Sequence, residues 1–156
     1  MKIIFLDIDG VVNCAKTRLV HEGFIDIDPA KADLVKRLIK NTGAKVVLSS
    51  TWRLSERSRE RVKELVTDFI DVTPRFRFDH IRGDRRGEEV ADWLSRHPEV
   101  TRYAILDDDN DFLPGQPLFK STWQDGLTEE IAKLAEDYLN SEMEYVPNFE
   151  GGLYTR

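Results

Sequence analysis

The sequence contains little that would stabilise a fold covalently or anchor it in a membrane. Its one cysteine, Cys14, excludes an internal disulfide framework and a cysteine-based zinc cluster. Its longest apolar runs, such as KVVL and YAIL, have the length of strands, so no segment is expected to span a bilayer. No secretory signal is expected either, because the apolar N-terminal stretch is interrupted at Asp7. These features favour a protein of the reducing cytoplasm, without membrane contact.

Composition places the chain among ordinary globular proteins. It has 156 residues, of which 40% are hydrophobic and 33% are charged, and its net charge is -6. This length suits one domain with a full core, and we expect residues 1–156 to form it. The acidic balance argues against extensive non-specific binding to nucleic acid. The tail after about residue 147 is expected to pack loosely.

Short apolar runs alternate with helical patterns, which is typical of an α/β fold with a mostly parallel sheet. Strands are expected over residues 2–6, 45–48 and 103–106, with a weaker one at 118–119. Helices are expected after the capping residues Asp28, Ser55 and Thr128, and a fourth over about residues 87–96. The apolar face of the helix after Ser55 is expected to include Val62, Leu65, Val66 and Phe69.

Acidic residues follow two of these predicted strands. FLDIDG places Asp7 and Asp9 after the first strand, and ILDDD places Asp107 and Asp108 after the third. As residues i and i+2 of an extended chain, Asp7 and Asp9 are expected to point to the same side and repel each other. The carboxyl ends of parallel strands meet at one edge of a sheet, where such oxygen ligands suit Mg2+. Taken singly, each acidic motif also fits a turn or a helix N-cap.

Hydroxyl and guanidinium groups are expected near the same edge. Ser49 and Ser50 follow the second predicted strand, where hydroxyl and main-chain N–H groups would face a phosphate. Arg53 lies close behind them, and Arg85 and Arg86 precede the helix over 87–96, so these guanidinium groups could hold an anion. Ordinary loop polarity and solvated arginines are the competing interpretation.

Phosphoryl transfer is the chemistry that needs this combination of groups. A carboxylate can attack phosphorus to form an aspartyl-phosphate once a metal ion and a cationic side chain offset the repulsion between two anions. A second carboxyl group can protonate the leaving oxygen and then deprotonate the hydrolytic water. Asp7 and Asp9 can divide these roles between them.

In this order, FLDIDGVV, VVLSS, RRGEEV and ILDDD resemble the four motifs of the haloacid dehalogenase (HAD) superfamily of phosphatases and phosphotransferases. The resemblance covers roughly residues 1–140 and implies a Rossmann-like, HAD-type fold. It implies that Asp7 is the nucleophile and a Mg2+ ligand, and that Asp9 is the general acid/base and binds the metal through its main-chain carbonyl. Asp108 would then touch the metal directly and Asp107 through water. Phosphate binding falls to Ser49 or Ser50, and to Arg86 or Arg85 where the superfamily usually has lysine.

Members of this superfamily differ in the cap modules inserted between their motifs. The intervals from Asp9 to Ser49 and from Arg53 to Arg86 are short and largely taken up by predicted helices. We therefore expect no sizeable cap. The site should be open and admit large substrates such as nucleic-acid ends or proteins.

Two shorter resemblances concern the substrate. SSTWR and GLTEE are similar to HAD domains associated with RNA repair, and GDRRGEEV followed by ILDDD is similar to the phosphatase half of polynucleotide kinase-phosphatases. They imply removal of 3'-phosphates from DNA or RNA ends. The many arginines between residues 53 and 86 could contact a phosphate backbone, but interleaved glutamates could equally pair with them on a helix surface.

Two other functions use the same residues. One is a phosphatase for a small metabolite such as a nucleotide or sugar phosphate. The other is a phosphate- or nucleic-acid-binding module without catalysis, which would not need an acid/base beside the nucleophile. The chain has no P-loop motif, so a kinase or ligase acting with it would be a separate partner.

Overall fold

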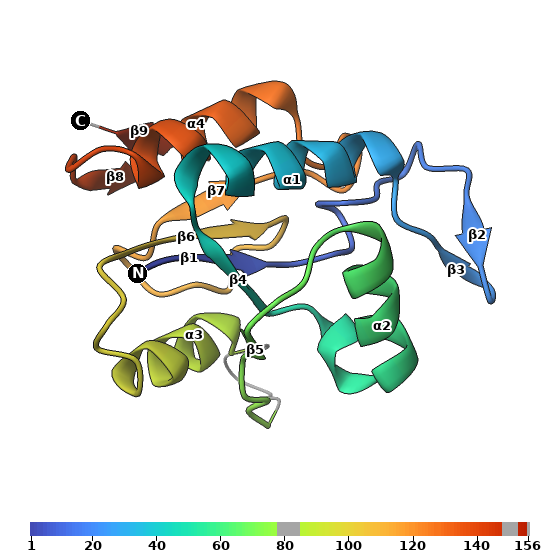
Figure 1. Ribbon diagram of the computed structural model, residues 1–156, viewed down its shortest axis with the longest axis horizontal. Helices are drawn as coiled ribbons and strands as arrows, with labels where there is room; N and C mark the ends of the chain where they lie inside the picture. Colours follow the sequence, from blue (N-terminus) through green and yellow to red (C-terminus); the bar gives the residue numbers. More distant parts are fainter. Residues whose placement is uncertain (78–84, 148–152, 156) are drawn as a thin grey trace.

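The computed structural model describes residues 1–77, 85–147 and 153–155, and its centre is a five-stranded sheet (Figure 1). The strands, in spatial order, are β5 (Asp71–Val72), β4 (Lys45–Leu48), β1 (Lys2–Leu6), β6 (Arg102–Asp107) and β7 (Leu118–Lys120). Every neighbouring pair is parallel. The sequence predicted four of these strands, and the α/β fold with a mostly parallel sheet is confirmed.

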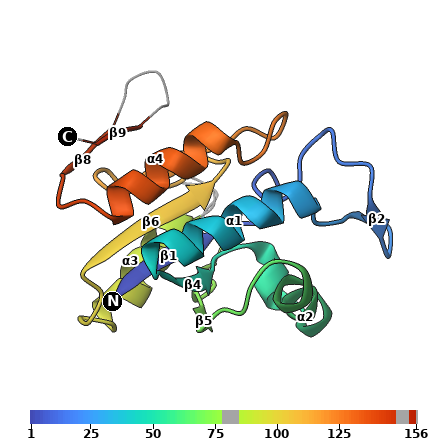
Figure 2. The same cartoon turned by 45° about the horizontal axis from the view of Figure 1, so that its top comes forward.

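Helices cover both faces of the sheet, as the views in Figures 1 and 2 show. On one face lie α1 (Pro29–Thr42) and α4 (Glu129–Leu139), and on the other lies α3 (Arg86–Ser95). The short 3-10 helix η1 (Thr51–Leu54) and then α2 (Glu56–Leu65) follow β4. Connections of this length between parallel strands have room for one helix each, which leaves the carboxyl ends of the strands uncovered.

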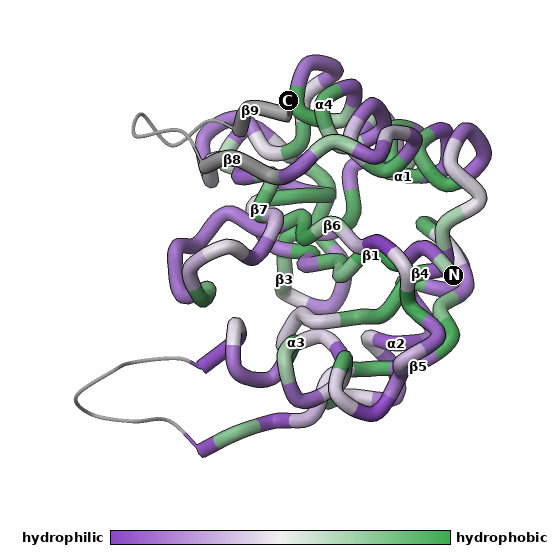
Figure 3. Tube along the Cα trace, turned by 90° about the vertical axis from the view of Figure 1, so that its left-hand side faces the viewer, coloured by the Kyte–Doolittle hydropathy of each residue, from purple (hydrophilic) through white to green (hydrophobic). Residues whose placement is uncertain are grey.

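The central strands alternate their side chains between two apolar cores. Ile4 and Leu6 of β1 face α1 and α4, whereas Ile3 and Phe5 pack with Val90 and Trp93 of α3. Both neighbouring strands keep the same alternation, so all three are apolar at nearly every position. Figure 3 shows these hydrophobic stretches at the centre of the molecule. Burial on both faces fixes the register of the strands, and with it the level at which each strand ends.

The helix boundaries follow the capping residues in the sequence. Asp28, Ser55 and Thr128 each accept a hydrogen bond from a main-chain N–H in the first turn of α1, α2 and α4. Gly43 ends α1 with a φ of 70°, a conformation that glycine adopts without a steric penalty. The predicted helix starts after Asp28, Ser55 and Thr128 are confirmed.

One predicted boundary is wrong, because α2 ends at Leu65 and Phe69 lies in the following loop. The chain leaves the helix to reach the edge of the sheet, where the Ile70 N–H donates to the Val46 carbonyl at 2.9 Å. Phe69 still packs against the core, but from the loop. The helical spacing of Phe69 therefore predicted its packing against the core correctly but did not predict the end of the helix.

Two antiparallel pairs were not predicted. In the first, β2 (Val20–His21) and β3 (Phe24–Ile25) form a hairpin whose turn residues Glu22 and Gly23 both have positive φ. In the second, β8 (Tyr145–Pro147) pairs with β9 (Leu153–Thr155). The rest of the tail that was expected to pack loosely, residues 148–152 and 156, lies outside the described residues.

The segment between the first two motifs adds only the hairpin and α1, and the described residues include no cap module. The prediction of a domain without a sizeable cap is therefore confirmed. None of the helices in the described part of the chain is long and apolar enough to cross a membrane.

Candidate active site

Three adjacent parallel strands bring their polar ends to one edge of the sheet. The Asp7 N–H donates to the Leu106 carbonyl of β6, and the Ser49 N–H donates to the Leu6 carbonyl of β1, both at 3.0 Å. These bonds continue the sheet ladder one residue past β1 and β4. The backbone at Asp7 and Ser49 is therefore as firmly placed as the strands themselves.

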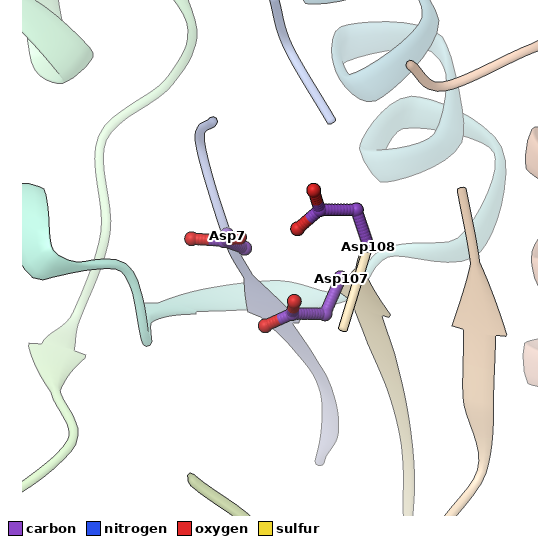
Figure 4. Close-up of side chains that lie close together, drawn as sticks. All are labelled: Asp7, Asp107 and Asp108. Carbon is purple, nitrogen blue, oxygen red and sulfur yellow. The ribbon is translucent and has the colours of Figure 1, made fainter. Parts of the chain in front are cut away.

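The carboxylates of Asp7, Asp107 and Asp108 form a cluster at this edge (Figure 4). Each offers an oxygen, and the three oxygens lie within 4.8 Å of one another. Asp7 is 4% exposed and Asp107 is fully buried, so water screens the repulsion between their charges only weakly. Three oxygen donors that converge in this way suit Mg2+, and we call them the acidic cluster.

The acidic cluster is approached closely by its neighbours in the chain. Gly10 has a φ of 81°, and a Cβ atom there would lie 2.1 Å from an Asp108 carboxylate oxygen. Glycine is therefore required both for the turn after FLDID and for the space that Asp108 occupies. This accounts for the glycine directly after the two aspartates.

Asp9 is not a member of the acidic cluster, and its carboxylate has other partners than that of Asp7. Strand β1 ends at Leu6, so the i and i+2 rule for extended chain does not apply to residues 7–9. The exposed Asp9 carboxylate instead accepts hydrogen bonds from Asn13 Nδ2 at 2.9 Å and Trp52 Nε1 at 3.1 Å. Asp9 is therefore held in one orientation at the open side of the site.

Arg86 supplies a basic partner to the acidic cluster. One guanidinium nitrogen lies 3.2 Å from Asp7 Oδ1 and 3.2 Å from Asp107 Oδ2. Burial lowers the pKa of Arg86, but Asp7 and Asp107 outweigh it and the net direction is upward. The guanidinium therefore keeps its charge. Arg85, the alternative considered from the sequence, bonds to Glu88 at 2.6 Å and lies over the ring of Phe76.

Close packing at the start of α3 places Arg86 against the strand ends. The Gly87 N–H donates to the Asp111 carbonyl at 2.9 Å. A Cβ atom on Gly87 would lie 2.6 Å from the main-chain nitrogen of Leu113. Only glycine permits this approach, because the obstacle is backbone rather than a movable side chain.

Burial opposes negative charge on the carboxyls of the acidic cluster when no cation is bound. Burial raises the pKa of Asp7 to about 6, although Arg86 opposes this. Burial, with the charge of Asp7, raises the pKa of Asp107 to about 9. Both carboxyls carry their negative charge at neutral pH more readily when a cation binds between them.

This predicts a pH-dependent stability in EDTA. The folded protein keeps protons on Asp7 and Asp107 that the unfolded chain has lost above about pH 4, so the unfolding free energy falls as pH rises through about 6 and on toward 9. Urea unfolding at pH 5 and at pH 8 should differ by up to about 5 kcal/mol through these groups, most of it from Asp107. Saturating Mg2+ should stabilise the protein more at the higher pH. An Asp107→Asn variant should show a shallower pH dependence, and an equal slope in both proteins would contradict the assignment.

The two serines after β4 have different surroundings. Ser50 Oγ accepts a hydrogen bond from the Trp52 N–H at 3.2 Å and so caps η1. Ser49 Oγ is buried and has no hydrogen-bond partner among the residues that the structure describes. A buried hydroxyl without a partner is costly, so of the two serines Ser49 is the one whose hydroxyl still lacks a hydrogen bond.

Arg53 does not offer a donor to an anion, and this corrects its expected role in substrate binding. Its five N–H donors all reach protein oxygens: Nε to Thr73, Nη1 to Ser49 and Ser50, and Nη2 to Pro74 and Glu89. The side chain is 4% exposed, and its ion pair with Glu89 spans 2.8 Å. Arg53 thus joins the loop that carries Ser49 and Ser50 to Glu89 of α3, one turn beyond Arg86.

The structure identifies three site residues that the sequence did not. Asn13 and Trp52 hold the Asp9 carboxylate, and Glu89 holds Arg53. Asn13 lies four residues after Asp9, Trp52 lies within SSTWR and Glu89 lies within RRGEEV, but nothing in the sequence shows which side chains these residues contact. A tryptophan at this position is also typical of core packing, and Glu89 resembles any acidic residue in the first turn of a helix.

Most arginines of the stretch 53–86 bond to protein oxygens. Arg57 pairs with Glu22, Arg61 pairs with Asp26 at 2.6 Å, and Arg59 donates to the Arg53 carbonyl at 2.5 Å. Arg82 lies outside the described residues. The arginines of α2 therefore join the hairpin and the loop to the helix, with most of their partners outside the interleaved glutamates that the sequence suggested.

The fold and the strand-end site define a HAD-type α/β domain, in which acidic residues follow β1 and β6 and a basic side chain comes from α3. A family model described as "HAD domain in Swiss Army Knife RNA repair proteins" matches residues 3–132. The chain belongs to this family. Membership supports a phosphatase-type activity, together with the Mg2+ that HAD proteins generally use. No curated protein and no solved structure gave a significant match.

Proposed function

We propose that the chain is a Mg2+-dependent phosphomonoesterase that removes 3'-phosphates from DNA or RNA ends through an aspartyl-phosphate on Asp7. The observation that carries this proposal is the position of Asp7. Its carboxylate is buried at a strand end, 3.2 Å from a guanidinium, within the acidic cluster. Those are the neighbours that a carboxylate needs in order to attack an anionic phosphate.

In the first step, an Asp7 oxygen attacks phosphorus and the bond from phosphorus to the ester oxygen breaks. Asp9 donates its proton to that leaving oxygen. In the second step, Asp9 takes a proton from water as the water oxygen attacks phosphorus, and the bond to Asp7 breaks. The hydrogen bonds from Asn13 and Trp52 orient the Asp9 carboxyl group for both transfers.

The remaining residues hold the transferring group. Arg86 and the Ser49 hydroxyl would donate hydrogen bonds to phosphate oxygens. Asp7, Asp107 and Asp108, with the Asp9 main-chain carbonyl, would hold Mg2+. When bound, the ion offsets the repulsion between the Asp7 carboxylate and the phosphate.

The substrate class rests on the family and on the open site. The family is described from RNA repair proteins, and no cap module covers the strand ends in the described residues. A polynucleotide end can reach such a site. Healing of an end also needs phosphorylation or joining, which a separate kinase or ligase in the same cytoplasmic compartment would supply.

The test is phosphate release from matched substrates with and without Mg2+. The panel contains one oligonucleotide with a 3'-phosphate, the same oligonucleotide with a 5'-phosphate, and a set of nucleotides and sugar phosphates. We expect the 3'-phosphorylated end to have a kcat/KM at least roughly 10-fold above the others. If a nucleotide or sugar phosphate were preferred, the enzyme would be a small-metabolite phosphatase. If substrates bound without any turnover, the chain would be a phosphate-binding module without catalysis.

A further inference from the structure

A pocket of about 610 Å³ lies beside Asp9, between the β2–β3 hairpin and α2. In Figure 1 the hairpin projects past the ends of α1 and α2. Asp9 and Trp52 belong to the pocket lining nearest the catalytic groups, and Phe24 and His21 come from the hairpin. The pocket is within the size range of small-molecule sites. It adjoins the residue proposed to protonate the leaving group, so it is on the leaving-group side of the scissile bond.

The walls of this pocket are fixed relative to each other. Arg57 of α2 pairs with Glu22 in the hairpin turn, and Arg61 pairs with Asp26 directly after the hairpin. The second pair is shielded, because the two side chains are only 22% and 9% exposed. The shielded Arg61–Asp26 ion pair therefore joins the hairpin side of the pocket to α2, with a smaller contribution from the exposed Arg57–Glu22 pair, and a preformed pocket lowers the entropic cost of binding.

The lining of the pocket suits a flat uncharged ligand rather than an anion. Phe24 is 73% exposed although it lines a cavity, and Trp52 contributes a second ring there. Four carboxylates line the pocket, namely Asp9, Glu22, Glu60 and Glu64, against two arginines that are already paired. A second phosphate would therefore be repelled, whereas a flat uncharged group gains contact with the rings.

From these observations we infer that the pocket binds the nucleoside that carries the scissile phosphate, with its base against Phe24. The inference rests on the proposed function and specifies it further: the enzyme reads the terminal nucleoside, and the rest of the polynucleotide leaves through the open side. Stacking on an aromatic ring tolerates every base, because each base has a flat face. The pocket thus selects a nucleoside leaving group without selecting a sequence.

The test compares two oligonucleotides that end in a 3'-phosphate, one with a normal terminal nucleoside and one with an abasic terminal sugar. Phe24→Ala should lower kcat/KM for the normal end by roughly 5- to 100-fold, mainly through KM, and should change the abasic end little. Val20→Ala is the matched control, since Val20 is on the same hairpin and 68% exposed but does not line the pocket. It should behave as wild type. An equal loss on both substrates, or no loss on either, would overturn the inference.

A binding measurement separates this inference from the proposed function. A nucleoside 3'-monophosphate is titrated against Asp7→Asn protein in Mg2+, with the fluorescence of Trp52 and the other tryptophans as the signal. Phe24→Ala in that background should weaken binding by a similar factor. Turnover without any dependence on the base would overturn the pocket assignment and leave the phosphatase standing. Base-dependent binding without turnover would support the pocket assignment and overturn the proposed phosphatase activity.

Discussion

Replacing Asp7 with asparagine is expected to lower kcat for phosphate release by roughly 10,000-fold or more. Asparagine has nearly the same shape and can still face Arg86, but its amide is a poor nucleophile and carries no charge. The Asp7 carboxylate is also one of the three members of the acidic cluster, so the variant should bind Mg2+ more weakly. Initial rates with the preferred substrate, measured over a range of Mg2+ concentrations, separate the two effects.

The matched control is Asp33→Asn, the same chemical change on α1, where the Asp33 side chain is 76% exposed. Its rate should equal that of the wild type. Circular dichroism of both variants checks whether they are folded. If Asp7→Asn kept more than about a tenth of the wild-type rate at saturating Mg2+, Asp7 would not be the nucleophile.

Replacing Arg53 with alanine is expected to cost about 3–5 kcal/mol of unfolding free energy. The substitution leaves the buried carboxylate of Glu89 without its ion pair and removes the donor from four main-chain carbonyls. Unpaired buried groups keep their full desolvation penalty, which is why the loss is large. Urea unfolding followed by circular dichroism measures it.

Two comparisons make this result specific. Arg57→Ala removes an arginine of the same stretch whose ion pair is exposed, and it should change the unfolding free energy little. Arg53→Lys keeps the positive charge but cannot reproduce five directed N–H bonds, so it should also destabilise the protein. If Arg53→Ala were as stable as wild type and only KM rose, Arg53 would bind the phosphate, as the sequence first indicated.

The parts of the fold that could be predicted from the sequence depend on local rules. Solid apolar runs such as KIIFL mark strands buried on both faces, and Asp28 followed by Pro29 marks the start of a helix. The strand-end rule then placed Asp7 and Asp107 at one edge before any side chain was located. The strands β2, β3 and β5 were not predicted, because two residues are too few to show an alternation of apolar and polar side chains.

The details of the site depend on tertiary contacts that the sequence does not encode locally. Asp9 turns toward Trp52, which is more than forty residues away, because the strand has already ended. Arg53 becomes buried only because Glu89 of α3 lies opposite it. Arginine near a phosphate motif fits both an anion-binding role and a structural one, and only the count of its occupied donors distinguishes them.

The most direct test of the central claim is to trap the phosphorylated enzyme. Protein mixed with substrate and Mg2+ is quenched in acid within the first turnovers, and the peptide that carries the phosphate is identified by mass spectrometry. We expect a hydroxylamine-sensitive phosphate on Asp7 that requires Mg2+ and is missing from Asp7→Asn protein. Rapid turnover without any such adduct, or an adduct on another residue, would contradict the account.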